Sequence, residues 1–264
     1  MSPALLPKPA PTTQAPEDDV QLSLRDHLME LRKRLKWALI WLMVGFGASY
    51  YWSQQIFHFM MQPVFEALPE GERALHFASS VEPFIIYLKV GLYSGLFASS
   101  PFIFWQIWMF VAPGLYRRER RKIAPFVLAA TVFFIAGAAF CYVVILPPAF
   151  RFLISSAGPD IRPVLMMDQQ LGLVMMMLLA FAIIFELPMV LTLLAMMGVV
   201  DYKFLSKYRR HAIIVNVVIA AFVTPTGDPF NLALMALPMM VCYELGVLGA
   251  WIFGKKGEIA RFNG

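Results

Sequence analysis

Charge is scarce in this sequence of 264 residues. Only 15% of the residues are Asp, Glu, Lys or Arg, 59% are hydrophobic, and the mean hydropathy is +0.66. A soluble domain carries about 25% charged residues, and a soluble chain of this composition would lack the polar surface needed to cover its exterior. The composition therefore excludes an ordinary soluble domain and a disordered chain, and it predicts an integral membrane protein.

Cysteine and the common catalytic motifs are also lacking. The two cysteines, Cys141 and Cys242, lie in apolar runs, which excludes a disulfide framework and a cysteine-rich zinc site. The sequence contains no H-E-x-x-H zinc motif, no G-x-S-x-G nucleophile elbow and no glycine-rich phosphate loop. We therefore expect no enzyme activity, no metal and no cofactor. The net charge of +5 follows the distribution of basic loops and gives no reason to expect nucleic-acid binding.

Long uncharged stretches separate tight clusters of charge. A bilayer core of about 30 Å requires about 20 helical residues. Four stretches are long enough to cross it, and Glu186 is the single charge within them: residues 37–65, 90–116, 123–150 and 169–200. The sequence therefore predicts four long membrane spans.

Two further apolar stretches are shorter. Residues 212–223 end before Thr224-Pro225, and residues 229–243 end before Glu244. A helix rises about 1.5 Å per residue, so the first stretch gives roughly 18 Å. The two form either a re-entrant hairpin or two short spans in a locally thinned bilayer. We favour two short spans, because the basic residues before the first can snorkel and lengthen it.

The number of Lys and Arg residues is high in one connecting segment and low in the next. Of the 22, all but four lie in the N-terminal segment, the second and fourth loops and the C-terminal tail. The four on the other side are Arg73, Lys89, Arg151 and Arg162. Because basic segments stay in the cytoplasm, we predict an all-α polytopic membrane protein with six transmembrane helices, both termini cytoplasmic and the last two spans short.

The same distribution divides the chain. Residues 1–21 are rich in proline and have no apolar core, which predicts a disordered cytoplasmic tail rather than a signal peptide. Residues 22–254 form the six-helix transmembrane domain, and residues 255–264 form a short cytoplasmic tail.

The segment before the first span has the pattern of a helix that lies at the membrane surface. Leucines form an apolar stripe at helical spacing: Leu24, Leu28, Leu31 and Leu35. His27, Glu30 and Arg34 share another face, which points away from the lipid. The residues alone favour an interfacial helix with a solvated, charged face.

Three other acidic residues have unusual surroundings. Glu119 lies among five basic residues, which is typical of a topology-setting loop and of attraction to anionic lipid. Glu186 lies near mid-membrane depth, where a carboxylate must be protonated, paired or exposed to water. It forms either a contact between the protein's own helices or a docking point for another polar membrane helix. Asp228 has the pattern of a turn on the outer side.

Several distinct motifs lie between residues 22 and 254. They are His27-Leu-Met-Glu-Leu-Arg-Lys-Arg-Leu35, Pro101, Gln106-Ile-Trp-Met-Phe-Val-Ala-Pro-Gly-Leu-Tyr116, Glu119-Arg120-Arg121, Phe185-Glu-Leu-Pro188, Thr224-Pro225, Leu237-Pro-Met239 and Tyr243-Glu-Leu-Gly-Val247. In these motifs the sequence resembles the TatC family, the core component of the twin-arginine protein translocase.

The resemblance implies a receptor for the paired arginines of signal peptides on folded proteins. Glu30 and Glu119 occupy the positions of the family's cytoplasmic glutamates, with Arg32 and Phe110 nearby in the same motifs. A guanidinium offers a planar fork of donors that matches a carboxylate, whereas lysine is a point charge. The resemblance thus implies signal-peptide binding through these residues.

The resemblance also implies partners and a location. Glu186 matches a mid-membrane glutamate that contacts the single-span partners TatA and TatB, and Pro63, Phe84 and Asp228 match sensitive outer-face positions. We therefore expect an oligomeric translocase complex in the bilayer of a bacterial cytoplasmic (inner) membrane, driven by the proton-motive force. The alternatives are a proton-coupled secondary transporter with Glu186 as the proton carrier, and an intramembrane hydrolase, which the missing nucleophile disfavours.

Overall fold

The computed structural model describes five parts of the chain: residues 24–69, 74–111, 123–156, 164–224 and 228–254. The regular elements in these parts are all helical: α1 (Leu24–Tyr51), α2 (Ser53–Ala67), α3 (Glu82–Val111), α4 (Ile123–Phe140), the π-helix η3 (Cys141–Ile145), α5 (Leu146–Ser155), α6 (Met167–Ile184), α7 (Leu187–Met197), α8 (Tyr202–Lys207), α9 (Arg209–Val223) and α10 (Pro229–Phe253). The predicted all-α class is confirmed. The predicted tails, residues 1–21 and 255–264, lie outside the described residues.

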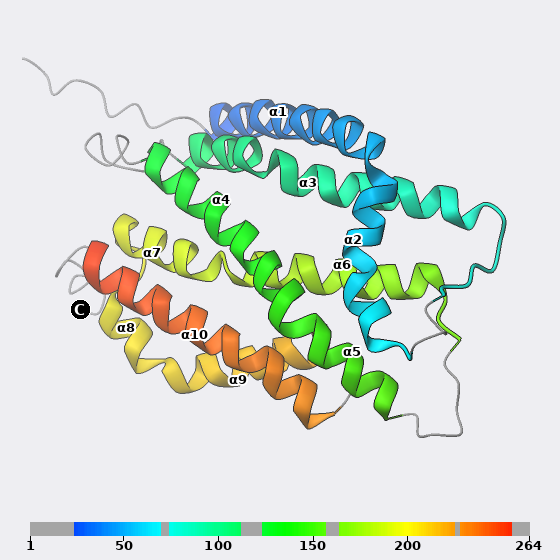
Figure 1. The fold of residues 1–264 in the computed structure, drawn as a ribbon. Helices are drawn as coiled ribbons and strands as arrows, with labels where there is room; N and C mark the ends of the chain where they lie inside the picture. The colour runs from blue at the N-terminus through cyan, green and yellow to red at the C-terminus, as the bar shows by residue number, and fades with distance from the viewer. Residues whose placement is uncertain (1–23, 70–73, 112–122, 157–163, 225–227, 255–264) are drawn as a thin grey trace, which may run out of the picture.

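Most helices run lengthwise between two ends of the molecule, whereas α2 runs across them (Figure 1). Four helical segments are long and apolar enough to cross a membrane: Glu82–Val111, Ala124–Ser155, Met167–Met197 and Pro229–Phe253. The other two lengthwise segments are α1, whose first turns are charged, and α9, which has only 15 residues. The start of α1 and the end of α10 lie at the same end of the molecule (Figure 1).

The first span differs from the sequence prediction. The prediction of a separate interfacial helix is wrong, because α1 is one continuous helix of 28 residues. The face that carries Arg34 packs against the last turns of α3, where Arg34 donates a hydrogen bond to Gln106. The uncharged stretch 37–65 is divided at Trp52, whose φ of −102° and ψ of 15° end α1 and turn the chain into α2.

The last helix is longer than predicted. The stretch predicted to end before Glu244 continues as α10 to Phe253, for 25 residues in all. Glu244 interrupts the apolar run but not the helix, because glutamate is a good helix former; its carboxylate pairs with Arg209 of α9, at 2.8 Å between Nη2 and Oε2. The length of α10 suits a complete crossing, which favours two spans over a re-entrant hairpin. The shortness of α9 is confirmed.

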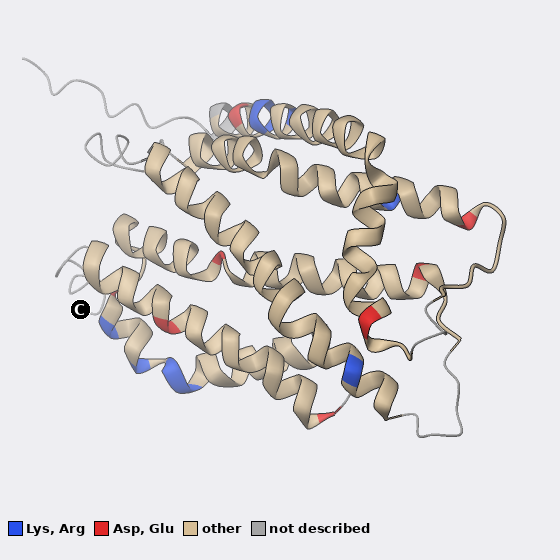
Figure 2. Ribbon diagram, in the orientation of Figure 1, with Lys and Arg blue, Asp and Glu red and all other residues tan. Residues whose placement is uncertain are grey.

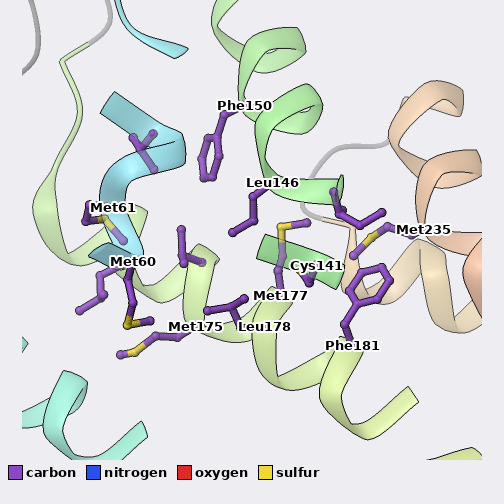
Figure 3. Packing of buried hydrophobic residues seen from close by; sticks show 14 of the residues in the cluster. Met60, Met61, Cys141, Leu146, Phe150, Met175, Met177, Leu178, Phe181 and Met235 are labelled. Carbon is purple, nitrogen blue, oxygen red and sulfur yellow. The ribbon is translucent and has the colours of Figure 1, made fainter. Parts of the chain in front are cut away.

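The main hydrophobic core lies where α2 crosses the lengthwise helices (Figure 3). Met61 of α2, Leu146 of α5, Phe181 of α6 and Met235 of α10 point into it and are buried. Because lipid is as apolar as these side chains, their close packing, rather than their removal from water, stabilises the contact between α2 and the other helices. The core therefore fixes α2 firmly against the other helices.

Glycines bring α1 and α3 into close contact. An ideal Cβ placed on Gly45 would lie 2.6 Å from the backbone oxygen of Gly95, and one on Gly95 would lie 2.5 Å from the nitrogen of Phe46. In a membrane, where no hydrophobic force drives helices together, small residues of this kind permit close backbone packing. The contact sets α1 alongside α3 and so positions the start of α1 beside the end of α3.

At the end opposite the start of α1, the α2–α3 and α5–α6 connections are joined through their backbones. The His76 N–H donates to the oxygen of Leu165 at 2.9 Å, and the Met167 N–H donates to the oxygen of His76 at 2.8 Å. These bonds form an isolated parallel bridge at His76. We call this the braced end.

Two charged side chains of α3, Glu82 and Lys89, reinforce the braced end. Both carboxylate oxygens of Glu82 accept backbone N–H groups, from Ala78 at 2.7 Å and from Asp168 at 3.2 Å. The ammonium of Lys89 donates to Asp168 Oδ1 at 2.5 Å. Segments that are more than 75 residues apart in the sequence are thus held together.

Candidate functional site: two carboxylates and a basic end

Cations gather at the end of the molecule where α1 begins (Figure 2). The described members of this group are Arg32, Lys33, Arg34, Lys36, Lys203, Lys207, Arg209 and Arg210. At the opposite end the described cations are Lys89 and Arg151. We call the first of these the basic end.

Glu30 lies on the second turn of α1 at the basic end. Its Oε1 accepts from Arg34 Nη2 at 3.3 Å, and its side chain keeps about 25% of its surface exposed. Arg34 reaches across to α3, where its Nη1 donates to Gln106 Oε1 at 3.5 Å. Among the described residues, the Glu30 carboxylate accepts a hydrogen bond through Oε1 alone. Its other oxygen can therefore still accept a hydrogen bond from a further donor.

An aromatic contact lies next to this ion pair. The rings of His27 and Phe110 stack with centroids 4.5 Å apart and planes inclined by 29°. His27 is one turn before Glu30 on the same face of α1. The structure therefore brings Phe110 to the side of α1 that carries Glu30.

The other predicted members of the site are Arg32 and Glu119. Arg32 is exposed, and two residues along a helix turn it about 200° away from Glu30. Glu119 lies outside the described residues. Sequence reasoning placed Arg34 on the face of Glu30 but missed Gln106 as its partner, because the two residues are 72 positions apart.

Glu186 lies at a break between two helices. It follows the last residue of α6 by two positions and precedes Leu187, the first residue of α7, and Pro188 is the second residue of α7. A proline has no N–H to donate and clashes with a helical carbonyl one turn earlier, so the helix is interrupted here. The carboxylate therefore lies where the helix of the fourth span is interrupted.

The surroundings of Glu186 are mostly apolar. Its Oε1 is buried and has no hydrogen-bond partner among the described residues. A groove of about 410 Å³ begins two residues further along, at Pro188, and is lined by α4, α7 and α10, including Phe126, Met189 and Leu248. A buried carboxylate oxygen without a donor is costly unless the group is protonated or paired.

The predicted outer-face residues have distinct roles in the fold. Pro63 is buried within α2, whereas Phe84 at the start of α3 is 58% exposed. Asp228 is the N-cap of α10, and its Oδ1 accepts the N–H of Asn231 at 2.8 Å. The sequence predicted only a turn here, although Asp followed by Pro before an apolar run is a signal for a helix start.

No metal site is found in the described parts of the chain, where no three His, Cys, Asp or Glu side chains are grouped suitably for a metal ion.

Comparison with known proteins gives the family. A family model described as "Sec-independent protein translocase protein (TatC)" matches residues 26–238, which include every candidate residue named above. The chain belongs to the TatC family. A TatC protein of Desulforapulum autotrophicum is 40% identical over 233 residues, which cover 88% of this chain and 86% of that protein. A TatC protein of Koribacter versatilis is 36% identical over 242 residues, covering 91% and 89%.

Solved TatC structures share the fold. A crystal structure of the twin-arginine translocase receptor TatC matches with a TM-score of 0.74 at 33% identity, covering 86% of this chain and 99% of the other. A second TatC receptor structure, in DDM, matches with a TM-score of 0.75 at 34% identity, covering 87% and 99%. This chain is thus a multi-pass helical membrane protein with the six-span fold of the TatC family.

Proposed function

We propose that this chain is the receptor subunit of a Sec-independent, twin-arginine protein translocase. It binds the signal peptides of folded proteins at the cytoplasmic face of a bacterial inner membrane, and transport draws on the proton-motive force. The concentration of cations at the basic end supports placing that end, and with it both termini, in the cytoplasm.

The observation that carries the proposal is the position of Glu30. Its carboxylate is held at the basic end, partly exposed, beside the stack of His27 on Phe110. An incoming guanidinium can bind this carboxylate through a fork of two donors while its stem packs on the aromatic rings. We assign the second arginine of the peptide to Glu119, on the sequence resemblance alone.

A peptide comparison tests this site. The full chain, in membranes, is photo-crosslinked to a twin-arginine signal peptide and to its twin-lysine version. We expect Glu30→Gln to weaken binding of the twin-arginine peptide by tenfold or more, because a charge-assisted hydrogen bond nets about 1.5–3 kcal/mol. Glu119→Gln is expected to act in the same direction.

The matched control is Glu66→Gln, which removes an exposed carboxylate of α2 that accepts, among the described residues, a hydrogen bond from Gln62. This variant should bind the twin-arginine peptide like the parent chain. Unchanged crosslinking in Glu30→Gln, or equal binding of the twin-lysine peptide, would contradict the proposed site.

We further propose that Glu186 receives a polar residue of a single-span partner helix of the TatA or TatB type. Its unpartnered Oε1 and the adjoining apolar groove support this role. Glu186→Ala should reduce copurification of the partner several-fold and spare peptide crosslinking, and Glu186→Gln should retain much of the association because an amide still accepts a bond. If the alanine variant copurifies the partner normally, Glu186 serves a contact within this chain instead.

The remaining parts of the proposal concern the outer face and the assembly. We propose that Pro63, Phe84 and Asp228 support transport from the outer side, and that the chain acts within an oligomeric translocase complex. The exposure of Phe84 supports a contact beyond this chain, whereas burial of Pro63 and the cap made by Asp228 support a role through the local fold.

A further inference from the structure

A second groove lies at the basic end, away from Glu30, and shares Leu245 and Leu248 of α10 with the groove beside Glu186. It has a volume of about 620 Å³ and is formed by α8, the first turn of α9 and one face of α10. One wall is polar and carries Tyr202, Ser206 and Arg209. The facing wall is largely apolar and carries Val241, Leu245, Leu248 and Trp251. The groove is therefore amphipathic along its length.

Contacts that join α8 and α9 to α10 fix the two walls of the groove relative to each other. The hydroxyl of Tyr243 donates to the oxygen of Leu205 at 2.8 Å, which fixes α8 against α10. Arg209 Nη2 pairs with Glu244 Oε2 at 2.8 Å, and both side chains remain about half exposed. A guanidinium has five N–H donors, so this one can bind a second anion while Glu244 holds it in place.

The charge around the groove favours an anionic ligand. Lys203, Lys207 and Arg210 are exposed on the same short stretch of α8 and α9. The acidic groups near them are Glu244, which is already paired, and Asp201, which precedes α8. The apolar residues of the facing wall are exposed on the outside of the helical bundle, where the chain meets the lipid.

We propose that this groove binds an anionic phospholipid. The phosphate accepts hydrogen bonds from Arg209 and from the hydroxyls of Tyr202 and Ser206, and the acyl chains lie along Val241 and Leu245. Juxtamembrane cations attract anionic headgroups, and the groove adds a defined place for one molecule. A membrane-spanning partner helix fits less well, because it would place apolar residues against the polar wall.

Photo-crosslinking in nanodiscs tests the proposal. The full chain is reconstituted in phosphatidylcholine with a small fraction of phosphatidylglycerol that carries a diazirine on its acyl chain, and labelled peptides are mapped. We expect labelling of α10 between Val241 and Leu248. Arg209→Gln should reduce it about tenfold, which corresponds to about 1.4 kcal/mol. Arg151→Gln, which removes an exposed cation at the opposite end, should leave it unchanged.

A second variant separates the groove from the surface charge. Val241→Trp fills the apolar wall of this groove alone and keeps every cation, and we expect it to reduce labelling as strongly as Arg209→Gln. Size-exclusion chromatography confirms that each variant is folded. Soluble glycerol phosphate in excess should fail to compete, because it lacks the acyl chains.

Three results would overturn the proposal. They are equal labelling of the parent chain and Arg209→Gln, equal labelling by a phosphatidylcholine probe, and competition by glycerol phosphate alone. Displacement of the probe by a single-span partner, with no effect of lipid charge, would assign the groove to a helix.

Discussion

At the braced end, two connections are joined by backbone hydrogen bonds of 2.8 and 2.9 Å, whereas at the basic end α1 and α3 meet through the stack of His27 on Phe110 and a side-chain hydrogen bond of 3.5 Å from Arg34 to Gln106. The carboxylates differ in the same way. Glu82 uses both oxygens on backbone N–H groups, and the described contacts of Glu30 use one oxygen on a side chain.

This difference separates a structural carboxylate from one that can bind a ligand. Exchange of a backbone partner requires the chain to move, whereas exchange of Arg34 requires only rotation of a side chain. On the proposed function, the basic end would accept a guanidinium without disturbing the fold, while the braced end keeps the α2–α3 and α5–α6 connections fixed.

The largest expected effect comes from separating α1 and α3, on which the geometry of the basic end depends. Gly95→Val places side-chain atoms against the backbone of Phe46, which cannot move without the whole helix. We expect a destabilisation of about 3 kcal/mol or more, measured as a loss of monodisperse protein after detergent extraction and a lower midpoint of thermal unfolding.

The control for this change is Gly47→Ala, because a Cβ at Gly47 meets no atom within 4 Å. This variant should extract and unfold like the parent chain or slightly better, since alanine favours a helix. A folded Gly95→Val protein that still binds the twin-arginine peptide normally would show that α1 can bind without close contact to α3.

The glycine contact marks what the sequence could and could not predict. The spacing Gly91-x-x-x-Gly95 within an apolar stretch is a signal for helix packing in membranes, and it would have paired α3 with a neighbour. It does not say that the neighbour is α1. The spans themselves could be predicted because a 30 Å apolar layer requires long uncharged runs.

Contacts between distant segments could not be predicted in the same way. Glu82 and Asp168 are 86 residues apart, and neither carries a local pattern that names the other. The role of Glu30 was predicted only through the family resemblance, since on local pattern alone its helix face was expected to be solvated. The end of α10 was predicted too early because the apolar run stops at Glu244, whereas glutamate is a good helix former and the helix continues to Phe253.

An intermediate effect is expected at the braced end. Glu82→Gln leaves one acceptor oxygen for two N–H groups, so either Ala78 or Asp168 loses its bond. Loss of a charge-assisted hydrogen bond costs about 1.5–3 kcal/mol locally, and amide hydrogen exchange around residues 76–82 and 165–168 should accelerate about tenfold or more.

Binding at the basic end sharpens this test. If the two ends act separately, Glu82→Gln should bind the twin-arginine peptide with the affinity of the parent chain. Glu66→Gln, at an exposed carboxylate of α2, should change neither exchange nor binding. A loss of peptide binding in Glu82→Gln alone would mean that the braced end controls the receptor site.

The smallest expected effect is at the resident ion pair. Arg34 competes with an incoming guanidinium for Glu30, so Arg34→Gln should strengthen twin-arginine peptide binding about two- to threefold. That factor corresponds to about 0.4–0.65 kcal/mol, close to the usual contribution of an ion pair one helical turn apart. Stability should change by a similar small amount, and Lys33→Gln removes an adjacent exposed cation as the control.

The direction of the change decides what Arg34 does. Tighter binding in Arg34→Gln but not in Lys33→Gln means that the resident arginine occupies the site and must be displaced. Equal tightening in both variants reports only the reduced positive charge of the basic end, which repels a basic peptide. Weaker binding in Arg34→Gln would mean that Arg34, anchored on Gln106, orients the carboxylate for its ligand, and the comparison of the two ends would then fail, because Glu30 would also depend on a fixed partner.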